Sequence, residues 1–154
     1  MSHDDRIEEL GLILPPAAKP VGLYKPAIVM GNLCMTSGHG PLHLDESLTT
    51  GCVGRELDQQ AGYDAARQTG LALLATLKDH LGSLNRVRRV VKLFGMVWCT
   101  ADFDQHPAVI NGCSELFKQV FGDDCGVGAR SAVGMNSLPL QMTVEIEGIF
   151  EIND

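Results

Sequence analysis

A single permanent cation stands in the segment GARSAVGMNSLP, residues 128–139, where Arg130 is the only charged side chain. Along an extended strand, Ala132, Gly134 and Asn136 share its face, so small residues surround it. A guanidinium beside open space can donate two parallel hydrogen bonds to a small carboxylate or phosphate. The segment therefore predicts an anion-binding arginine; the alternative is an arginine that only pairs with a glutamate on a solvated sheet face.

The following segment, QMTVEIEGIFEI at residues 141–152, alternates strictly between apolar and polar side chains, as a strand with one buried face does. The short SLPL link before it predicts an antiparallel hairpin with the strand that carries Arg130. If the apolar faces of both strands cover helices, Arg130 shares the opposite face with Glu145 and Glu147. This parity predicts that the cation and the two carboxylates lie on a face that the core does not use.

Two histidines four residues apart, His39 and His43, could suggest a metal site. Pro41 between them is incompatible with a helix, and the sequence offers no third ligand nearby, so we predict no metal. His39 is interpreted either as a wall or an acid of a pocket or as a loop histidine exposed to water.

Five cysteines are scattered without a CxxC spacing, which favours reduced thiols in a cytosol. Cys113 and Cys34 are the two that we consider as nucleophiles, but neither has an evident base partner in the sequence, so burial is the favoured interpretation. No GxxxxGK[ST] pattern is present, and a phosphate-binding loop is therefore not predicted.

The elements that position these residues follow from capping and periodicity. Residues 1–20 are interpreted as an N-terminal extension, with a short helix capped by Ser2 or Asp4, a stop at Gly11 and a stiff connector at 14–20. In the domain at 21–154, the patterns predict strands at 22–30 and 32–38 around a Gly31-Asn32 turn, a helix at 59–81 between Asp58 and Gly82, a strand at 87–100, and a helix from an Asp102 or Asp104 cap to Gly122.

Together with the last two strands, this order predicts an α+β domain with two helices on one face of a mixed sheet. The chain has 154 residues, enough for one domain with a substantial core. Its net charge of −7 disfavours broad attachment to nucleic acid or anionic lipid, and the one basic cluster, at 86–92, is more typical of a solvated face. No apolar run reaches the roughly 18 residues of a membrane helix, so we expect a cytoplasmic protein.

Four segments together resemble the RidA/YjgF family, also known as the Rid or L-PSP endoribonuclease-like family: GLYKPAI at 22–28, NLCMTSGHGPL at 32–42, VINGCSELF at 109–117 and ARSAVGMNSLPLQMTVEIEGI at 129–149. The resemblance runs from about residue 20 to the end. It implies a chorismate-mutase-like fold that assembles as a homotrimer with a central barrel and clefts between subunits. It also implies hydrolysis of reactive 2-enamine or 2-imine acids to 2-keto acids and ammonia, with no metal or organic cofactor.

By this resemblance, Arg130 holds the carboxylate of a small substrate and Glu145 activates the attacking water. The backbone of Ser37 and Gly38 would fix the substrate. Tyr24 would line the cleft, and Asn111 would help to build it from the second helix. Two positions indicate a divergent subfamily. Many deaminating members carry Cys or Thr where this chain has Ala132, and the loop usually carries glutamine where this chain has His39. Three function classes follow: an imine deaminase, a non-catalytic trimeric protein that binds a small ligand, and an endoribonuclease, which the acidic charge disfavours.

Overall fold

The computed structural model describes all 154 residues, which form one five-stranded sheet in the order β1-β2-β5-β3-β4. The strands span Ala27–Met30 (β1), Leu33–Thr36 (β2), Val87–Trp98 (β3), Ala129–Met135 (β4) and Val144–Ile152 (β5). The helices span His3–Glu9 (α1), Gln59–Leu81 (α2) and His106–Phe121 (α3), and short 3-10 turns span Leu84–Arg86 (η1) and Pro139–Gln141 (η2).

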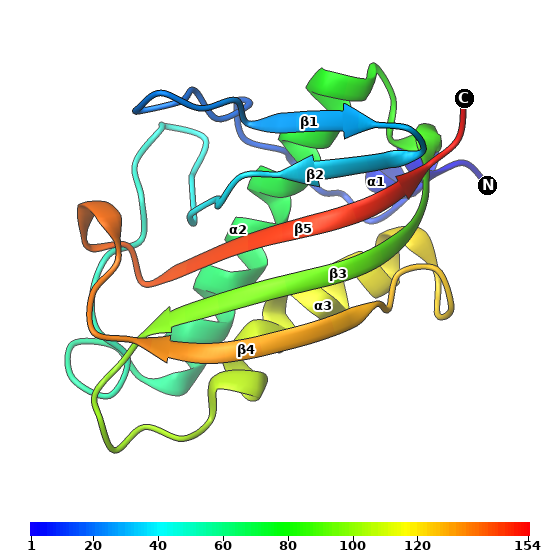
Figure 1. The fold of residues 1–154 in the computed structure, drawn as a ribbon. Coiled ribbons are helices and arrows are strands. Elements are labelled where there is room, and N and C mark those ends of the chain that lie inside the picture. The colour runs from blue at the N-terminus through cyan, green and yellow to red at the C-terminus, as the bar shows by residue number, and fades with distance from the viewer.

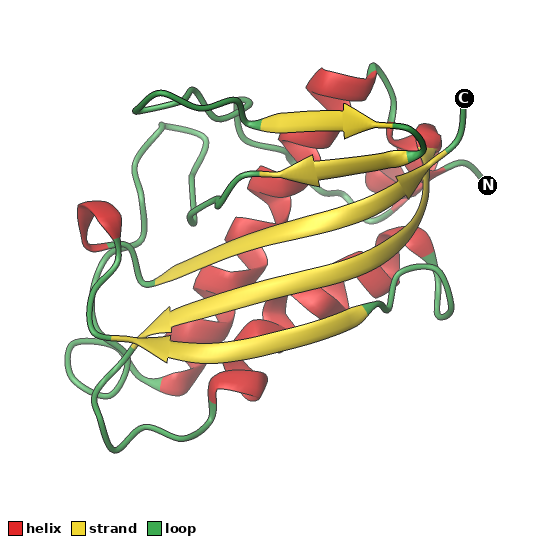
Figure 2. Ribbon diagram, in the orientation of Figure 1, coloured by secondary structure: helices red, strands yellow, loops and turns green.

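The two long helices, α2 and α3, lie side by side on one face of the sheet (Figures 1 and 2). Glycine allows them to approach closely: a Cβ on Gly112 of α3 would collide with the carbonyl oxygen of Tyr63 on α2. Buried side chains between these helices and the sheet form the main core, including Leu73, Phe117 and Phe150. The predicted α+β architecture, with two helices on one face of a mixed sheet, is therefore confirmed.

Most predicted helix ends are confirmed, and one is wrong. The Asp58 side chain accepts a hydrogen bond from the Ala61 amide at 2.8 Å where α2 begins, and Gly82, at φ +84°, ends it. The predicted aspartate cap of α3 is absent, because the residue before this helix is Gln105, whose side chain makes no capping hydrogen bond. Pro107 in the first turn compensates in part, since it brings no amide that would need a partner.

The predicted hairpin between the last two strands is also wrong. β4 pairs with β3 in parallel, and β5 pairs in antiparallel fashion with both β2 and β3. Parallel pairing of β3 and β4 follows from the crossover through α3, which returns the chain to the same end of the sheet. The link at 136–143 is longer than a tight turn, contains η2, and carries the chain past β3 to its other side. The Gly31-Asn32 turn between β1 and β2 is confirmed.

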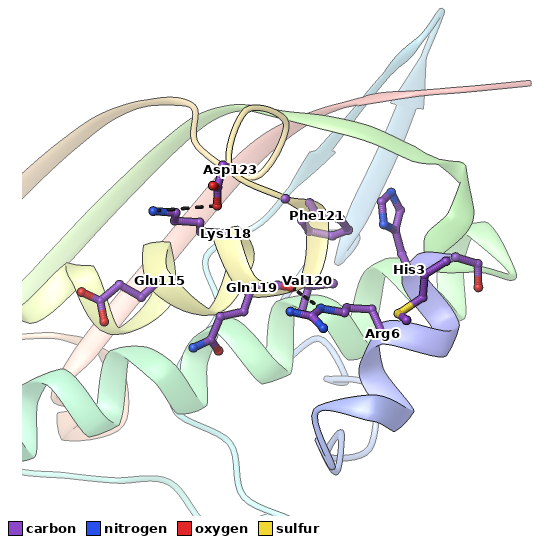
Figure 3. A pocket seen from close by; sticks show the side chains of 11 residues that line it. His3, Arg6, Glu115, Lys118, Gln119, Val120, Phe121 and Asp123 are labelled. Atoms are coloured by element: carbon purple, nitrogen blue, oxygen red, sulfur yellow. Dashed lines mark hydrogen bonds and ion pairs between the residues drawn. The ribbon is translucent and has the colours of Figure 1, made fainter.

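Residues 1–14 lie against the helices rather than apart from them. The Asp4 carboxylate pairs with the Lys78 amine of α2 at 3.2 Å, and the Arg6 guanidinium donates to the carbonyl of Gln119 of α3 at 2.9 Å (Figure 3). Ile7 is buried in the main core. No helix of the chain is both long and apolar enough to cross a membrane.

Candidate functional site

Five of the residues predicted for the site line one pocket of about 560 Å³ at the end of the sheet where β5 begins. They come from three segments: the residues just before β1, the loop after β2, and β5 itself. The residues are Tyr24, Ser37, Gly38, His39 and Glu145. The fold therefore gathers, within one chain, the residues to which the resemblance assigns water activation and most substrate contacts.

Glu145 points from β5 to the sheet face that the helices leave free, opposite Met96 of β3. Its carboxyl group closely approaches Gly38: a Cβ on Gly38 would lie 2.8 Å from the carboxyl carbon. Burial raises the pKa of Glu145, and the negative charge of Glu147 raises it further. A carboxyl group tuned in this direction is a better proton acceptor near neutral pH than an ordinary exposed glutamate.

His39 is buried, with 4% of its surface exposed, so the interpretation as a water-exposed loop residue is wrong. Its Nδ1 donates to the carbonyl of Ser37 at 2.7 Å, and Nε2 lies 2.8 Å from the hydroxyl of Thr76 on α2. Burial lowers the pKa of His39 and holds the ring neutral. With both nitrogens occupied, His39 links the loop to α2 at the floor of the pocket and has no free nitrogen for a ligand.

The N-terminal connector also forms part of this pocket, which the sequence analysis did not predict. Ala17, Ala18 and Lys19 lie along its wall, together with Glu46 of the loop at 43–50. The Ser37 hydroxyl donates to the carbonyl of Lys25 at 2.6 Å and so joins the loop after β2 to the residues that lead from the connector into β1. The signal in the sequence was weak, since a proline-rich segment such as 14–20 predicts a stiff path but not its neighbours.

Arg130 occupies a second and smaller pocket, of about 270 Å³, between β4 and α3. Its Nη1 donates to Asn111 Oδ1 at 2.8 Å and to Ser114 Oγ at 3.0 Å, and its Nη2 lies 3.4 Å from the carbonyl of Pro107. These contacts hold the guanidinium plane against the helix. Asn111, predicted to build the cleft from the second helix, contacts Arg130, and Ser114, one turn further along α3, was not predicted.

The predicted common face of Arg130 and Glu145 is wrong. Arg130 of β4 pairs with Leu93 of β3, and Leu93 pairs on its other side with Gly148 of β5. Directly paired residues share a face, so all three belong to the helix-covered face. Glu145 belongs to the other face. In a direct hairpin Arg130 would share a face with Glu145, but β3 lies between β4 and β5, and its pairing with both strands places Arg130 on the helix-covered side.

Ala132 follows Arg130 on the helix-covered face, opposite Gly95, and packs against the edge of the main core. Its methyl group adds no polar atom there. The two cysteines considered as nucleophiles, Cys34 and Cys113, are buried, as expected, and burial raises the pKa of each thiol. No group of three or more His, Cys, Asp or Glu side chains lies close enough to hold a metal ion.

A further hollow, of about 710 Å³, lies between α1 and the C-terminal half of α3 (Figure 3). Its charged groups are engaged with neighbours: the Arg6 guanidinium with the Gln119 carbonyl, and the Lys118 amine with Asp123 at 3.9 Å. None of the predicted site residues lines it. We therefore interpret it as the seam where the N-terminal helix docks.

Comparison with known proteins identifies the family. The profile described as "YjgF/chorismate mutase-like, putative endoribonuclease" matches residues 4–147. Protein TCP17 of Trypanosoma cruzi is 36% identical over 148 residues, which cover 96% of this chain and 92% of that protein.

Among solved structures, a protein of unknown function from Agrobacterium tumefaciens, Atu1372, is 41% identical, with a TM-score of 0.89 over 98% of this chain and 92% of that one. A "putative endoribonuclease" from Shewanella oneidensis is 29% identical, with a TM-score of 0.93 over 99% and 100% of the two chains. RidA from an Antarctic Psychrobacter species is 30% identical, with a TM-score of 0.60 over 90% and 94%. With its sheet, its two covering helices and this similarity over nearly its full length, the chain belongs to the YjgF/RidA family of chorismate-mutase-like fold.

Proposed function

We propose that the protein hydrolyses reactive 2-imino acids to 2-keto acids and ammonia, in a cleft formed by two subunits of a homotrimer. The observation that carries the proposal is the division of the site residues into two complementary halves. One half offers a half-buried carboxyl group in a pocket, and the other an oriented guanidinium. A small 2-imino acid needs one group of each kind.

Arg130 suits the carboxylate of such a substrate. Its contacts to Asn111, Ser114 and Pro107 fix the guanidinium before a ligand arrives, and the side chain remains half-buried rather than enclosed. The donors that these contacts leave free can bind a carboxylate in a bidentate manner. Orientation in advance reduces the entropy that binding costs.

Glu145 suits the proton transfer. A water oxygen forms a bond with the imine carbon, the C=N π electrons move to nitrogen, and a water proton passes to the Glu145 carboxylate. That proton then reaches the nitrogen and gives a carbinolamine. The remaining hydroxyl proton passes to the nitrogen by the same carboxylate, the C–N bond breaks, and ammonia leaves as the C=O bond of the keto acid forms. Because an iminium carbon is already electrophilic, holding the substrate and placing the water can supply most of the acceleration.

A trimer is the second part of the proposal, and the free face of the sheet supports it. That face carries a second apolar cluster, in which Met96, Leu138 and Met142 are buried and further apolar side chains are half-exposed: Phe94, Trp98, Val133 and Met135. In β1, Ile28 and Met30 are 51% and 64% exposed. An apolar surface of this extent is typical of a face that another subunit covers.

The test is an assay in which 2-iminopropanoate is generated enzymatically and its disappearance is followed. We expect decay above the buffer rate with the wild type, and decay near the buffer rate with Arg130→Ala and Glu145→Gln. A wild type no faster than buffer would refute the activity for this substrate. Light scattering tests the assembly, for which we expect three times the chain mass of 16.6 kDa; a mass of one chain would refute the shared cleft.

A non-catalytic ligand-binding role is the second candidate, and Ala132 favours it because its methyl group adds no polar atom at this position of β4. It predicts that 2-oxobutanoate binds, as measured by calorimetry, while the imine decays at the buffer rate. An endoribonuclease role, suggested by the descriptions of relatives, is less supported. Two of the four basic residues in the cluster at 86–92 already have acidic partners: Arg88 pairs with Glu151 at 3.3 Å and Arg89 with Asp124 at 2.9 Å.

A further inference from the structure

A thiol and an imidazole form a hydrogen-bonded pair where β3 ends and α3 begins. Cys99 Sγ lies 3.3 Å from His106 Nε2. The ring of Phe103 meets the imidazole edge to face, with centroids 5.4 Å apart, and helps to hold its orientation. A nucleophilic atom within hydrogen-bond reach of a base is the arrangement that activates a thiol.

The neighbouring strand leaves room for this pair. A Cβ on Gly134 of β4 would lie 2.6 Å from His106 Nε2 and 2.9 Å from Cys99 Sγ, so any larger residue would displace one of them. Cys99 and His106 are half-buried, and Gly134 is exposed. The pair therefore borders the surface of the chain.

Cys99 is the one cysteine that is both half-buried and hydrogen-bonded to an imidazole. Cys34, Cys52 and Cys113 are buried, and Cys125, which is half-buried, makes no hydrogen bond to an imidazole. Burial raises the pKa of the Cys99 thiol, and nearby Cys52 adds to this effect. The resting thiol therefore keeps its proton and donates it to His106, so its reaction as a nucleophile needs that base.

We propose that Cys99 is a modification site for soft carbon electrophiles of the α,β-unsaturated carbonyl class, with His106 as the proton acceptor. Sγ forms a bond with the β-carbon, the C=C π electrons move to the α-carbon, and the thiol proton passes to His106 Nε2 and then to the α-carbon. The product is a thioether, and no further reactant is consumed.

The adduct would act on the arginine half of the site, a step that rests on the proposed function. His106 is the first residue of α3 and directly precedes Pro107, whose carbonyl faces Arg130 Nη2 at 3.4 Å. This helix end has no side-chain cap, and the contact with Cys99 is one of the interactions that hold its first residue. A group added to Sγ needs the space over Gly134 that the imidazole occupies, so the modification should displace the first turn and loosen the guanidinium.

The first test uses N-ethylmaleimide on the native full-length protein, with the labelling rate of each cysteine followed by peptide mass spectrometry. We expect Cys99 to react at least about tenfold faster than Cys125, and His106→Gln to slow Cys99 by about tenfold or more, because glutamine can accept the hydrogen bond but is not a base. His80→Gln, a change of a histidine on α2, is the matched control and should leave the rate unchanged. Equal rates for Cys99 and Cys125, or a wild-type rate in His106→Gln, would overturn the site.

The second test measures the affinity for 2-oxobutanoate by calorimetry before and after labelling. We expect about tenfold weaker binding in the labelled wild type, corresponding to about 1.4 kcal/mol, and no change when Cys99→Ala is treated in the same way. Unchanged affinity in the labelled wild type would overturn the effect on Arg130. Neither measurement needs turnover, so a protein that labels and binds as expected but does not hydrolyse imine would refute the proposed function alone.

Discussion

Arg130 and Glu145 lie on opposite faces of one sheet, Arg130 on the helix-covered face opposite Leu93 and Glu145 on the free face opposite Met96. One small ligand therefore cannot reach both residues of the same chain without passing through the sheet. If both act on one substrate, they must come from different subunits. The proposed chemistry therefore requires an assembly of at least two subunits.

The first prediction follows from this division. Mixing two inactive variants, Arg130→Ala and Glu145→Gln, by refolding them together should restore activity, because some clefts then receive the intact residue from each subunit. Random assembly of equal amounts should restore about one quarter of the wild-type sites. Each variant refolded alone is the control. Activity no greater than that of the separate variants, in trimers shown to be mixed by mass, would mean that the two residues do not share a cleft.

The second prediction concerns pH. A general base must be deprotonated, so activity should rise as the pH rises through the pKa of Glu145, which burial and Glu147 hold above its ordinary value. Glu147→Gln removes the charge that raises this pKa, and should move the acidic limb of the kcat/KM profile to lower pH. Glu151→Gln, on the same face of β5 but farther along it, should leave the limb in place. A limb that does not move in Glu147→Gln would exclude Glu145 as the titrating base.

The third prediction concerns the orientation of the guanidinium. Asn111→Ala removes the acceptor at 2.8 Å from Arg130 Nη1, so the guanidinium should lose its fixed plane and bind a carboxylate less well. We expect KM to rise about tenfold, since a hydrogen bond to a charged group contributes roughly 1.5 kcal/mol, with a smaller change in kcat. Gln119→Ala, on the same helix, is the control. An equal fall in kcat with unchanged KM would argue against a binding role.

Local rules predicted much of the fold. The ends of α2 follow from an aspartate cap, a leucine stripe and a glycine stop, and the turn at Gly31 follows from its permissive backbone at φ +61°. These signals lie within a few residues of the features that they determine. The residues of the site could be named for the same reason, since the motifs that carry them are local.

The arrangement of the site could not be read in this way. Whether Arg130 faces the helices depends on which strand is the neighbour of β4, and that is set by the crossover through α3 and not by the alternation along β4. Similarly, the burial of His39 depends on Thr76, a residue 37 positions away on α2. The alternation along one strand shows which of its side chains share a face. Only the order and register of the strands show which face of the sheet that is.

The fourth prediction concerns Gly38. Its missing Cβ leaves the space in which the Glu145 carboxyl group lies, since an added methyl would be 2.8 Å from the carboxyl carbon. Gly38→Ala should therefore displace the carboxylate and lower kcat by about tenfold or more, because small misplacements of a reacting group are costly. The fold should tolerate the change, as measured by thermal unfolding. In the control Gly22→Ala, the new methyl would meet Tyr24 at an ordinary 3.6 Å. Activity equal to that of the control would show that the carboxylate is not held where we infer.

The last prediction concerns the stability of the pocket floor. Burial lowers the pKa of His39 in the folded chain below the ordinary value of 6.5, so between these two values the unfolded chain binds more protons than the folded one. The free energy of unfolding should therefore fall as the pH falls below about 6.5, by at most about 1.4 kcal/mol per pH unit from this group.

Above that pH the ring is neutral in both states and its titration contributes nothing to the slope. Glutamine does not titrate and can still hydrogen-bond with the Ser37 carbonyl or the Thr76 hydroxyl, so His39→Gln should remove this part of the acid sensitivity. Urea unfolding of both proteins at several pH values, at one fixed protein concentration, measures the difference. If the difference between wild type and His39→Gln is the same at pH 5 and pH 8, His39 is not held neutral, and its role as a buried link between the loop and α2 is wrong.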